Sequence, residues 1–305
     1  LRTVVGNAYL LCRIADTIED APALAVEEKK QLTRMFAGAV AKETSVEEFV
    51  ASATARLDST TPEPERQLVA NAARVVRVTR SFPEAQQAAL ARCVRIMAEG
   101  VGTFQNDRFR YGLPDQEHVD AYCYYVAGVV GEMLTELFCS YSPAIARHRQ
   151  KLRRLAVSFG QGLQMTNILK DLWEDKGRDV CWLPQSTFEE EGVDLKRLSA
   201  ENRCEGFERG LVRLIAIARD HLKNALNYAL VIPKSEWAIR KPCLWAIGMA
   251  LLTLRKINRR RNFTSAAQVK ISRRSVAYVI RVSRLIGRSN ILLRTAFSLL
   301  CLGLP

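Results

Sequence analysis

Two short acidic segments share the pattern D-x-x-E-D and carry the residues best suited to chemistry. They are Asp16-Thr-Ile-Glu19-Asp20 and Asp171-Leu-Trp-Glu174-Asp175. On a helix, the two aspartates of each segment lie one turn apart, about 5–6 Å between Cβ atoms, so their carboxylates face the same space. Such close like charges need a compensating cation or strong solvation. Mg²⁺ suits them, because it binds one or two carboxylates together with water and phosphate oxygens.

The sequence around each segment favours a binding site over a solvated helix face, the ordinary alternative for a lone acidic cluster. Both segments follow mostly apolar helical stretches, and each has a cation beside it: Arg13 before Asp16, and Lys170 before Asp171. This pattern indicates a diphosphate held through metal ions. The metal would neutralise the leaving diphosphate, so that an allylic C–O bond can ionise without a protein nucleophile.

The elements that must position these residues are predicted to be helices throughout. Apolar residues recur at helical spacing along the chain, and no Asn-Gly or Asp-Gly hairpin signal occurs. We therefore expect an all-α protein with ten or more helices and short loops at 59–65, 80–83, 111–115, 176–186 and 231–235.

Helix-start signals and the absence of linkers complete the expected organisation. Ser45-x-x-Glu48, Ser81-Phe-Pro-Glu84 and Ser186-x-x-Glu189 are typical of capping boxes, and Ser142-Pro143 of an N-cap followed by an N1 proline. No repeat of 20–50 residues or low-complexity linker interrupts the chain. We predict one domain over residues 1–305, preceded by a further segment because Leu1 begins inside an apolar helical run.

The positive charge is concentrated in the last quarter of the chain. After Glu236 there are 14 Lys or Arg residues and no Asp or Glu. Residues 276–305 are expected to form a basic amphipathic helix, helical over 276–300, with Arg281, Arg284 and Arg288 on one face. This helix could lie on an anionic membrane surface, or its basic face could be solvated while the rest packs on the core. A nucleic-acid partner is not expected of the basic cluster Arg255-Lys256-Ile-Asn-Arg259-Arg260-Arg261, Lys270 and Arg273-Arg274, since it has no aromatic interleaving or recognised nucleic-acid motif.

Cysteine and histidine usage excludes two other classes of protein. The eight cysteines show no C-x-x-C spacing and the three histidines are far apart, which predicts reduced thiols and no zinc site. No signal peptide is expected, and the apolar tail at 296–304 is too short to span a bilayer. We expect a cytoplasmic monomer that is peripheral on the membrane, or that faces the cytosol at the endoplasmic reticulum if a C-terminal anchor has been removed.

With the acidic segments, the stretch Tyr122-Cys-Tyr-Tyr-Val-Ala-Gly-Val-Val-Gly131 resembles the squalene/phytoene synthase family. The resemblance extends from Leu1 to about Arg274. It implies an all-helical, single-domain bundle of the isoprenoid-synthase type, with the two aspartate motifs on opposing helices of a central cavity. The family's Ser-Arg/Lys-Ser-Phe motif would precede Leu1.

The resemblance assigns roles residue by residue. Tyr122 corresponds to the family's acid/base or cation-stabilising tyrosine, while Tyr9 and Arg13 match positions that contact diphosphate or steer its departure. Lys170 stands where squalene synthases commonly have Arg, and it cannot offer the same bidentate fork. The implied metal ligands are Asp16, Asp20, Asp171 and Asp175, and the implied substrate-binding residues also include Gln164, Asn167, Lys170, Arg178 and Tyr125.

The product implied is squalene, formed from two farnesyl diphosphates through presqualene diphosphate with reduction by NADPH. Tyr125 favours this product, because phytoene synthases usually have Arg there, and the segment Gly177-Arg178-Asp-Val-Cys-Trp182-Leu-Pro184 gives weaker support. Arg273 and Arg274 are candidates for the NADPH phosphate. The alternatives are a presqualene diphosphate, dehydrosqualene or phytoene synthase, and a non-catalytic helical family member.

Overall fold

The computed structural model describes residues 1–105 and 107–305, and these divide into two compact units. The first unit comprises residues 1–106 and 132–146, and the second comprises residues 107–131 and 147–305. Within the described ranges there is no β-strand, and one isolated backbone bridge joins Leu113 to Pro184. The all-α prediction is confirmed, while one domain over 1–305 stays a prediction.

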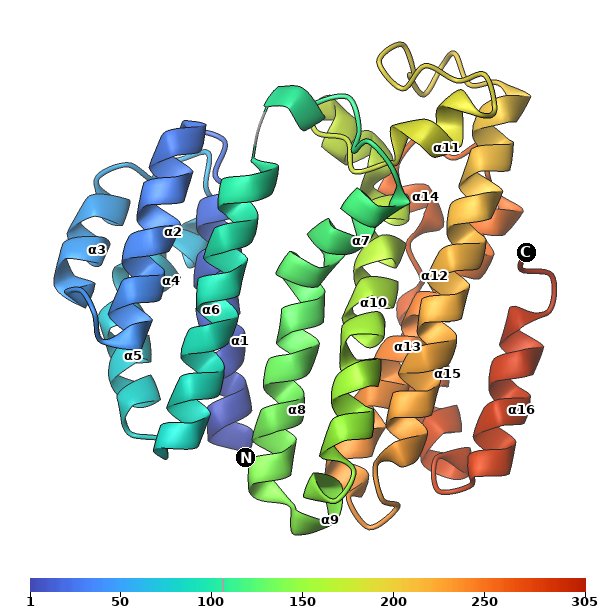
Figure 1. The fold of residues 1–305 in the computed structure, drawn as a ribbon. Helices are drawn as coiled ribbons and strands as arrows, with labels where there is room; N and C mark the ends of the chain where they lie inside the picture. Colours follow the sequence, from blue (N-terminus) through green and yellow to red (C-terminus); the bar gives the residue numbers. More distant parts are fainter. Residues whose placement is uncertain (106) are drawn as a thin grey trace. The chain divides into compact units, whose positions relative to one another are not determined.

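The first unit is built from helices at the N-terminal end of the chain, coloured blue to green in Figure 1. Its core contains Phe36 and Phe49, whose fully buried rings lie 5.0 Å apart. The helices are α1 (Arg2–Asp20), α2 (Val26–Ala41), α3 (Val46–Thr54), α4 (Glu63–Ala70), α5 (Ala72–Arg80) and α6 (Glu84–Phe104), with most of α8 (Val129–Tyr141) and α9 (Pro143–Ala146).

In the second unit the long helices α10 and α12 pack against each other, and α12 also packs on α13. The rings of Trp173, Phe188, Phe207 and Phe263 form its aromatic core. Its elements are η1 (Asp107–Phe109), α7 (Gln116–Cys123), η2 (Tyr124–Gly128), α10 (Arg149–Gly177), α11 (Gln185–Glu189), α12 (Glu205–Val231), α13 (Trp237–Arg259), α14 (Ala266–Val269), α15 (Arg273–Ile286) and α16 (Asn290–Cys301).

Helix α10 approaches the segment after α7 so closely that only glycine fits at the contact. A Cβ atom on Gly160 would lie 2.3 Å from the carbonyl oxygen of Ala127, and one on Gly131 would lie 2.4 Å from that of Ala156. Residues 124–128 here form a π-helical turn, a distortion often found at functional sites. Backbone contact with α10 therefore fixes the segment that follows Tyr122.

Two of the predicted caps are confirmed and two are wrong. Ser45 accepts a hydrogen bond from the Glu48 backbone N–H at 3.2 Å, and Ser142 accepts one from that of Ile145 at 3.3 Å. Ser81 instead ends α5, and Pro83 takes the N-cap of α6 because its fixed φ already suits a helix start. Ser186 lies inside α11, whose N-cap is Pro184.

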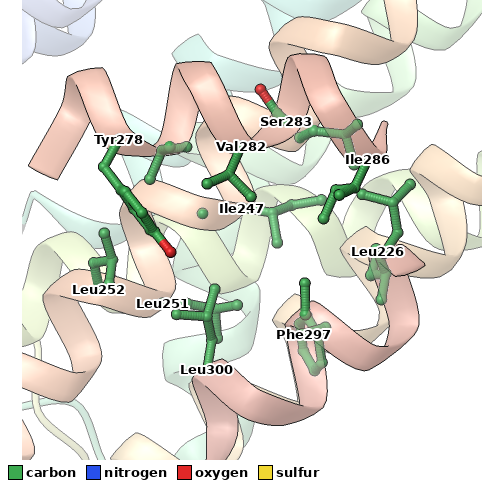
Figure 2. A pocket seen from close by; sticks show the side chains of 15 residues that line it. Leu226, Ile247, Leu251, Leu252, Tyr278, Val282, Ser283, Ile286, Phe297 and Leu300 are labelled. Atoms are coloured by element: carbon green, nitrogen blue, oxygen red, sulfur yellow. The ribbon is translucent and has the colours of Figure 1, made fainter. Parts of the chain in front are cut away.

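The single C-terminal helix predicted over 276–300 is also wrong, because the chain forms two helices there. Helix α15 ends at Ile286 with Gly287 as its C-cap, and Ser289 caps α16 by accepting from the Leu292 N–H at 3.3 Å. Both helices pack on α13. Figure 2 shows the apolar pocket they enclose, with Ile247 and Leu251 of α13 facing Val282 and Phe297.

Candidate active site

The first acidic motif lies in the last turns of α1. The helix buries one stripe that includes Leu11, Ile14 and Ile18. This stripe holds the opposite residues in place: Asp16 is half-buried, and Asp20, the last residue of the helix, is exposed. The sequence-predicted pair of aspartates thus occupies successive turns of one helix in the first unit.

Burial and neighbouring carboxylates disfavour the charged forms of two acidic side chains in this motif. Burial raises the pKa of Asp16 to about 7; the neighbouring Asp20 adds to the rise, and Arg13 opposes it. Burial likewise raises the pKa of Glu19 to about 8, with Asp20 and Asp16 contributing, while Gln105 donates to its carboxylate at 3.5 Å. Carboxylates with pKa values raised in this way are the oxygen ligands expected at a site that binds a cation.

Arg13 lies one turn before Asp16 but is ion-paired with Glu65, at the start of α4. The prediction made no use of Glu65, which fell at the end of an expected loop. Its only sequence signal was the acidic first turn of a helix beginning with Glu63-Pro64. Tyr9 lies one turn before Arg13 on α1 and is 66% exposed.

The second acidic motif lies near the end of α10, and both of its aspartates have basic partners. Lys170 Nζ lies 3.1 Å from Asp171 Oδ2 and donates to Asn167 Oδ1 at 3.3 Å. Arg178 donates to Asp175 Oδ1 at 2.6 Å. The two motifs therefore share a sequence pattern but differ in their local charge balance.

Other polar side chains of α10 either lie near the second motif or hold another helix in place. Gln164 is half-buried on α10, one turn before the exposed Asn167. Glu174, the central acid of the second motif, accepts a hydrogen bond from the backbone N–H of Ala266 at 2.7 Å and so anchors the first turn of α14. Glu174 thus has a structural role that the sequence pattern did not indicate.

Tyr122 is buried at the end of α7, and its ring stacks on Trp182. The ring centroids lie 3.8 Å apart and the ring planes differ by 9°. Tyr125, in the π-helical turn, is half-buried and meets Tyr124 edge to face at 5.7 Å. The structure thus brings together Tyr122 and a tryptophan sixty residues later in the chain.

A network of Ser158, His221 and Asp120 links α10, α12 and α7. His221 Nδ1 lies 2.8 Å from Ser158 Oγ, and its Nε2 lies 3.9 Å from Asp120 Oδ1. Burial lowers the pKa of His221, against the influence of Asp120 and Asp220. Asn224 also donates to Ser158 Oγ at 3.0 Å, so the hydroxyl is held within the helix packing rather than presented as a nucleophile.

Some basic residues in the last quarter of the chain stabilise the fold. Arg255 donates to the carbonyl oxygens of Leu299 and Leu300 at 3.1 and 2.7 Å, which satisfies the C-terminal end of α16. Arg273 and Arg274, the NADPH candidates, are exposed in the first turn of α15.

In the part of the chain that the structure describes, metal-ligating side chains do not form a complete metal site of their own. Among the described residues, no group of three or more His, Cys, Asp or Glu side chains could hold a metal ion. Mg²⁺ does not require such a cage, because it usually keeps waters and shares substrate phosphate oxygens with one or two carboxylates. The aspartate pairs fit that mode of binding.

Sequence comparison identifies relatives that cover most of this chain. The model of the family described as squalene/phytoene synthase matches residues 1–275. Squalene synthase clz20 of Cochliobolus lunatus is 30% identical over 226 residues, covering 72% of this chain and 51% of that protein. The human squalene synthase is 26% identical, with 75% and 51% coverage. The chain therefore spans about half the length of these curated relatives.

Solved structures share the fold. TcSQS in complex with the ligand BPH1237 has a TM-score of 0.77 at 22% identity, covering 97% of this chain and 82% of that chain. A dehydrosqualene synthase in complex with a ligand has a TM-score of 0.64 at 19% identity, with 94% and 87% coverage. The predicted fold type is thereby confirmed. The family match over residues 1–275 shows that the chain belongs to the squalene/phytoene synthase family.

Proposed function

We propose that this protein joins two farnesyl diphosphates head to head, through presqualene diphosphate, to give squalene. The observation that carries the proposal is the charge state of the first acidic motif. Asp16 and Glu19 have raised pKa values, and the nearest guanidinium, Arg13, is ion-paired with Glu65. A motif of this kind favours a divalent cation and, with it, an anionic substrate.

The aspartates of both motifs are the proposed ligands of Mg²⁺. When bound, Mg²⁺ would neutralise the diphosphate and so ease its departure. Arg13, Lys170 and Arg178 each lie beside a motif and already bind a carboxylate, so a diphosphate oxygen could replace that partner. The proposed metal ligands are Asp16, Asp20, Asp171 and Asp175.

Aromatic and amide side chains would then bind and orient the carbon skeleton. Tyr122 is the proposed acid/base or cation-stabilising group, since a phenol can donate or accept a proton and its ring face attracts cations. Tyr9 lies on the same helix as Asp16 and would contact diphosphate. Gln164 and Asn167 lie on the same helix as Asp171 and would contribute hydrogen bonds to the substrate.

NADPH is the proposed reductant of the second half-reaction and would supply hydride. Arg273 and Arg274 offer two exposed guanidinium groups, a donor chemistry that fits its phosphate. Reversing both charges should raise the KM for NADPH without changing the KM for farnesyl diphosphate. An unchanged NADPH KM would exclude this pair as the phosphate contact.

The second candidate is an enzyme that makes another head-to-head product. A 15-cis-phytoene synthase of Pantoea ananas is 33% identical over 119 residues, covering 39% of this chain. Tyr125, at the position where phytoene synthases usually have arginine, favours squalene over phytoene. Presqualene diphosphate and dehydrosqualene would result if NADPH were not used.

We further propose a monomer that lies in the cytoplasm and binds the surface of an anionic membrane. Its substrate and product carry long apolar chains, which favours chemistry close to a bilayer. In the described part of the chain, none of the helices has the length and apolar character needed to cross a membrane.

The test is product analysis with purified protein, farnesyl diphosphate and Mg²⁺, with and without NADPH. Asp16→Asn and Asp171→Asn should each lower turnover by about 10²-fold or more, because each removes a metal ligand that acts on the leaving group. Asp58→Asn and Asp194→Asn are matched controls, since both residues are exposed acids that bind local backbone N–H groups.

Each outcome of this experiment has a distinct meaning. Squalene that appears only with NADPH, and is lost in both motif variants but neither control, supports the proposal. Presqualene diphosphate with or without NADPH would indicate an enzyme of the first half-reaction. A protein with no turnover, even when extended at its N-terminus with the family's Ser-Arg/Lys-Ser-Phe motif, would point to a non-catalytic family member.

A further inference from the structure

The stack of Tyr122 on Trp182 limits how Tyr122 can meet a substrate. The two rings are nearly parallel at 3.8 Å, so the indole covers one face of the phenol. Tyr122 is buried, whereas Trp182 is half-buried. A substrate can therefore reach Tyr122 only at its other face, its edge or its hydroxyl group.

Trp182 is itself held in place by the backbone on both sides. Cys181 and Leu183 are buried and anchor the segment. The carbonyl of Leu183 accepts from the Leu113 N–H at 2.9 Å, and the Leu113 carbonyl accepts from the Gln185 N–H at 2.7 Å. These bonds fasten the segment to residues 111–114, just before α7, the helix that carries Tyr122.

The fit at this junction depends on Gly112. Its φ is +132°, which favours glycine, and an added Cβ atom would lie 2.9 Å from the carbonyl oxygen of Leu183. Gln185 also donates from its side chain to the Gly112 carbonyl at 2.7 Å. The position of the indole is thus determined by a network rather than by one contact.

The same segment begins at the second acidic motif. Arg178 and Val180 each donate a backbone N–H to the Asp175 carbonyl at 2.9 Å, and the Arg178 side chain binds the Asp175 carboxylate. Asp179 adopts a left-handed φ of +60° and is ion-paired with Arg110 at 2.5 Å. Only a short segment therefore separates Asp175, a proposed metal ligand, from Trp182, whose ring covers Tyr122.

We propose that Trp182 is a positioning residue for Tyr122, and that it links the orientation of the phenol to the second acidic motif. This inference rests on the proposed function, in which Tyr122 acts on the reacting carbon skeleton. A flat aromatic ring at position 182 fixes the phenol plane and excludes water from one of its faces. A side chain of similar apolar character without a π face would leave the phenol free to tilt.

The test compares Trp182→Leu, which removes the ring, with Trp182→Phe, which keeps a flat face. Trp182→Leu should lower kcat by about 10- to 100-fold, since small misplacements of a reacting group are that costly. The KM for farnesyl diphosphate should change by less than about twofold, and Trp182→Phe should retain kcat within about threefold. Trp245→Leu is the matched control: Trp245 is half-buried in the same unit and donates to Ser283 Oγ at 2.8 Å.

A double-mutant cycle separates positioning from general packing. If Trp182 acts through Tyr122, then Trp182→Leu should cause little further loss of kcat in a Tyr122→Phe background. Additive losses, or an equal loss in Trp245→Leu, would overturn the inference. If the wild-type protein turns over no prenyl diphosphate, the proposed function fails separately. The same cycle is then measured on Tm, where additive shifts would disprove the coupling of the two rings.

Discussion

At the scale of single residues, Arg13 shows how a partner distant in sequence alters a motif. Its guanidinium lies one turn from Asp16 but is ion-paired with Glu65. Glu65 also acts directly on Asp16 and helps to raise its pKa. In the second motif, Lys170 and Arg178 bind the aspartates themselves. The two motifs therefore differ in their local ion pairs, since Arg13 binds a glutamate of another helix whereas Lys170 and Arg178 bind the motif aspartates.

His221 gives a residue-scale prediction about stability and pH. Burial lowers its folded-state pKa below the ordinary value, so the unfolded chain binds a proton more readily. Stability from neutral His221 is present above the ordinary histidine pKa of about 6.5 and is lost as the pH falls below it. His221→Gln should reduce the loss of stability between about pH 7 and pH 5.

The measurement is Tm across this pH range for the wild type, His221→Gln and His148→Gln. His148 is exposed and serves as the control. Between pH 7 and pH 5 the wild type and His148→Gln should lose Tm in parallel, and His221→Gln should lose less. An equal fall of Tm with pH in all three proteins would show that burial of His221 does not contribute to the loss of stability at acid pH.

At the scale of elements, the contact between α10 and the π-helical turn leads to the next prediction. Gly160→Ala would force a Cβ atom to within 2.3 Å of the Ala127 carbonyl oxygen, which requires backbone movement. We expect a loss of about 1–3 kcal/mol in the free energy of unfolding, as in other overpacked cores. Because this contact fixes the segment after Tyr122, kcat should fall as well.

Chemical denaturation and turnover of the same samples would check this expectation. Gly102→Ala in α6 is the matched control, because an added Cβ atom there meets nothing within 4 Å. It should be neutral or stabilise the protein by up to about 1 kcal/mol through helix propensity. A Gly160→Ala protein as stable as the wild type would mean that α10 can shift without cost.

The elements that could be predicted from sequence are those fixed by local signals. Ser45 and Ser142 cap helices as expected, and the loops at 80–83, 111–115 and 231–235 fall between helices. The break in the expected 276–300 helix at Gly287 was missed, because apolar periodicity continues across it. The π-helical turn and the Tyr122–Trp182 stack depend on contacts between distant segments, which no local pattern contains.

The residues of the candidate site also divide into those with local sequence signals and those that depend on distant contacts. The aspartates, Tyr122 and the basic residues near the motifs could be identified because their types and spacing are local. Glu65, and the use of Glu174 to anchor α14, could not, since each involves a partner more than fifty residues away. Spacing along a helix reveals which side chains share a face, but burial, and to a smaller extent partners from other helices, also set their charge state.

At the scale of the whole molecule, exposed apolar side chains and positive charge coincide at the C-terminal helices. Of the nine exposed large hydrophobic residues among those described, six lie on α15 and α16 or just after them. Five exposed arginines share these helices, and no acidic residue occurs after Glu236. The six are Tyr278, Leu285, Ile291, Leu292, Leu299 and Leu302.

This composition fits an anionic lipid surface better than an ordinary solvated face. Leu285 is 83% exposed and Ile291 is 77% exposed, although burial would favour both. The opposite sides of α15 and α16 already enclose the apolar pocket of Figure 2, so these helices are apolar on two faces. Basic side chains beside exposed apolar ones are typical of helices that lie in the membrane interface.

We therefore expect the protein to bind vesicles that contain phosphatidylserine and to bind phosphatidylcholine vesicles much more weakly. Neutralising Arg281, Arg284 and Arg288 to Gln should weaken binding by about 3 kcal/mol, roughly 10²-fold, since each basic residue near such a surface contributes about 1 kcal/mol. Sedimentation with vesicles at two salt concentrations measures this. The matched control neutralises three exposed residues of the same charge elsewhere: Arg147, Lys151 and Arg154.

The pattern of the two triple variants decides whether α15 and the turn after it lie at the membrane. Loss of binding in the Arg281, Arg284 and Arg288 variant alone, with greater binding at low salt, would locate the surface on α15 and the turn that follows it. Equal losses in both variants would indicate attraction by net charge without a defined face. If Leu285→Ser then weakens binding as well, the apolar side chains enter the lipid, because headgroup attraction alone does not depend on an uncharged residue.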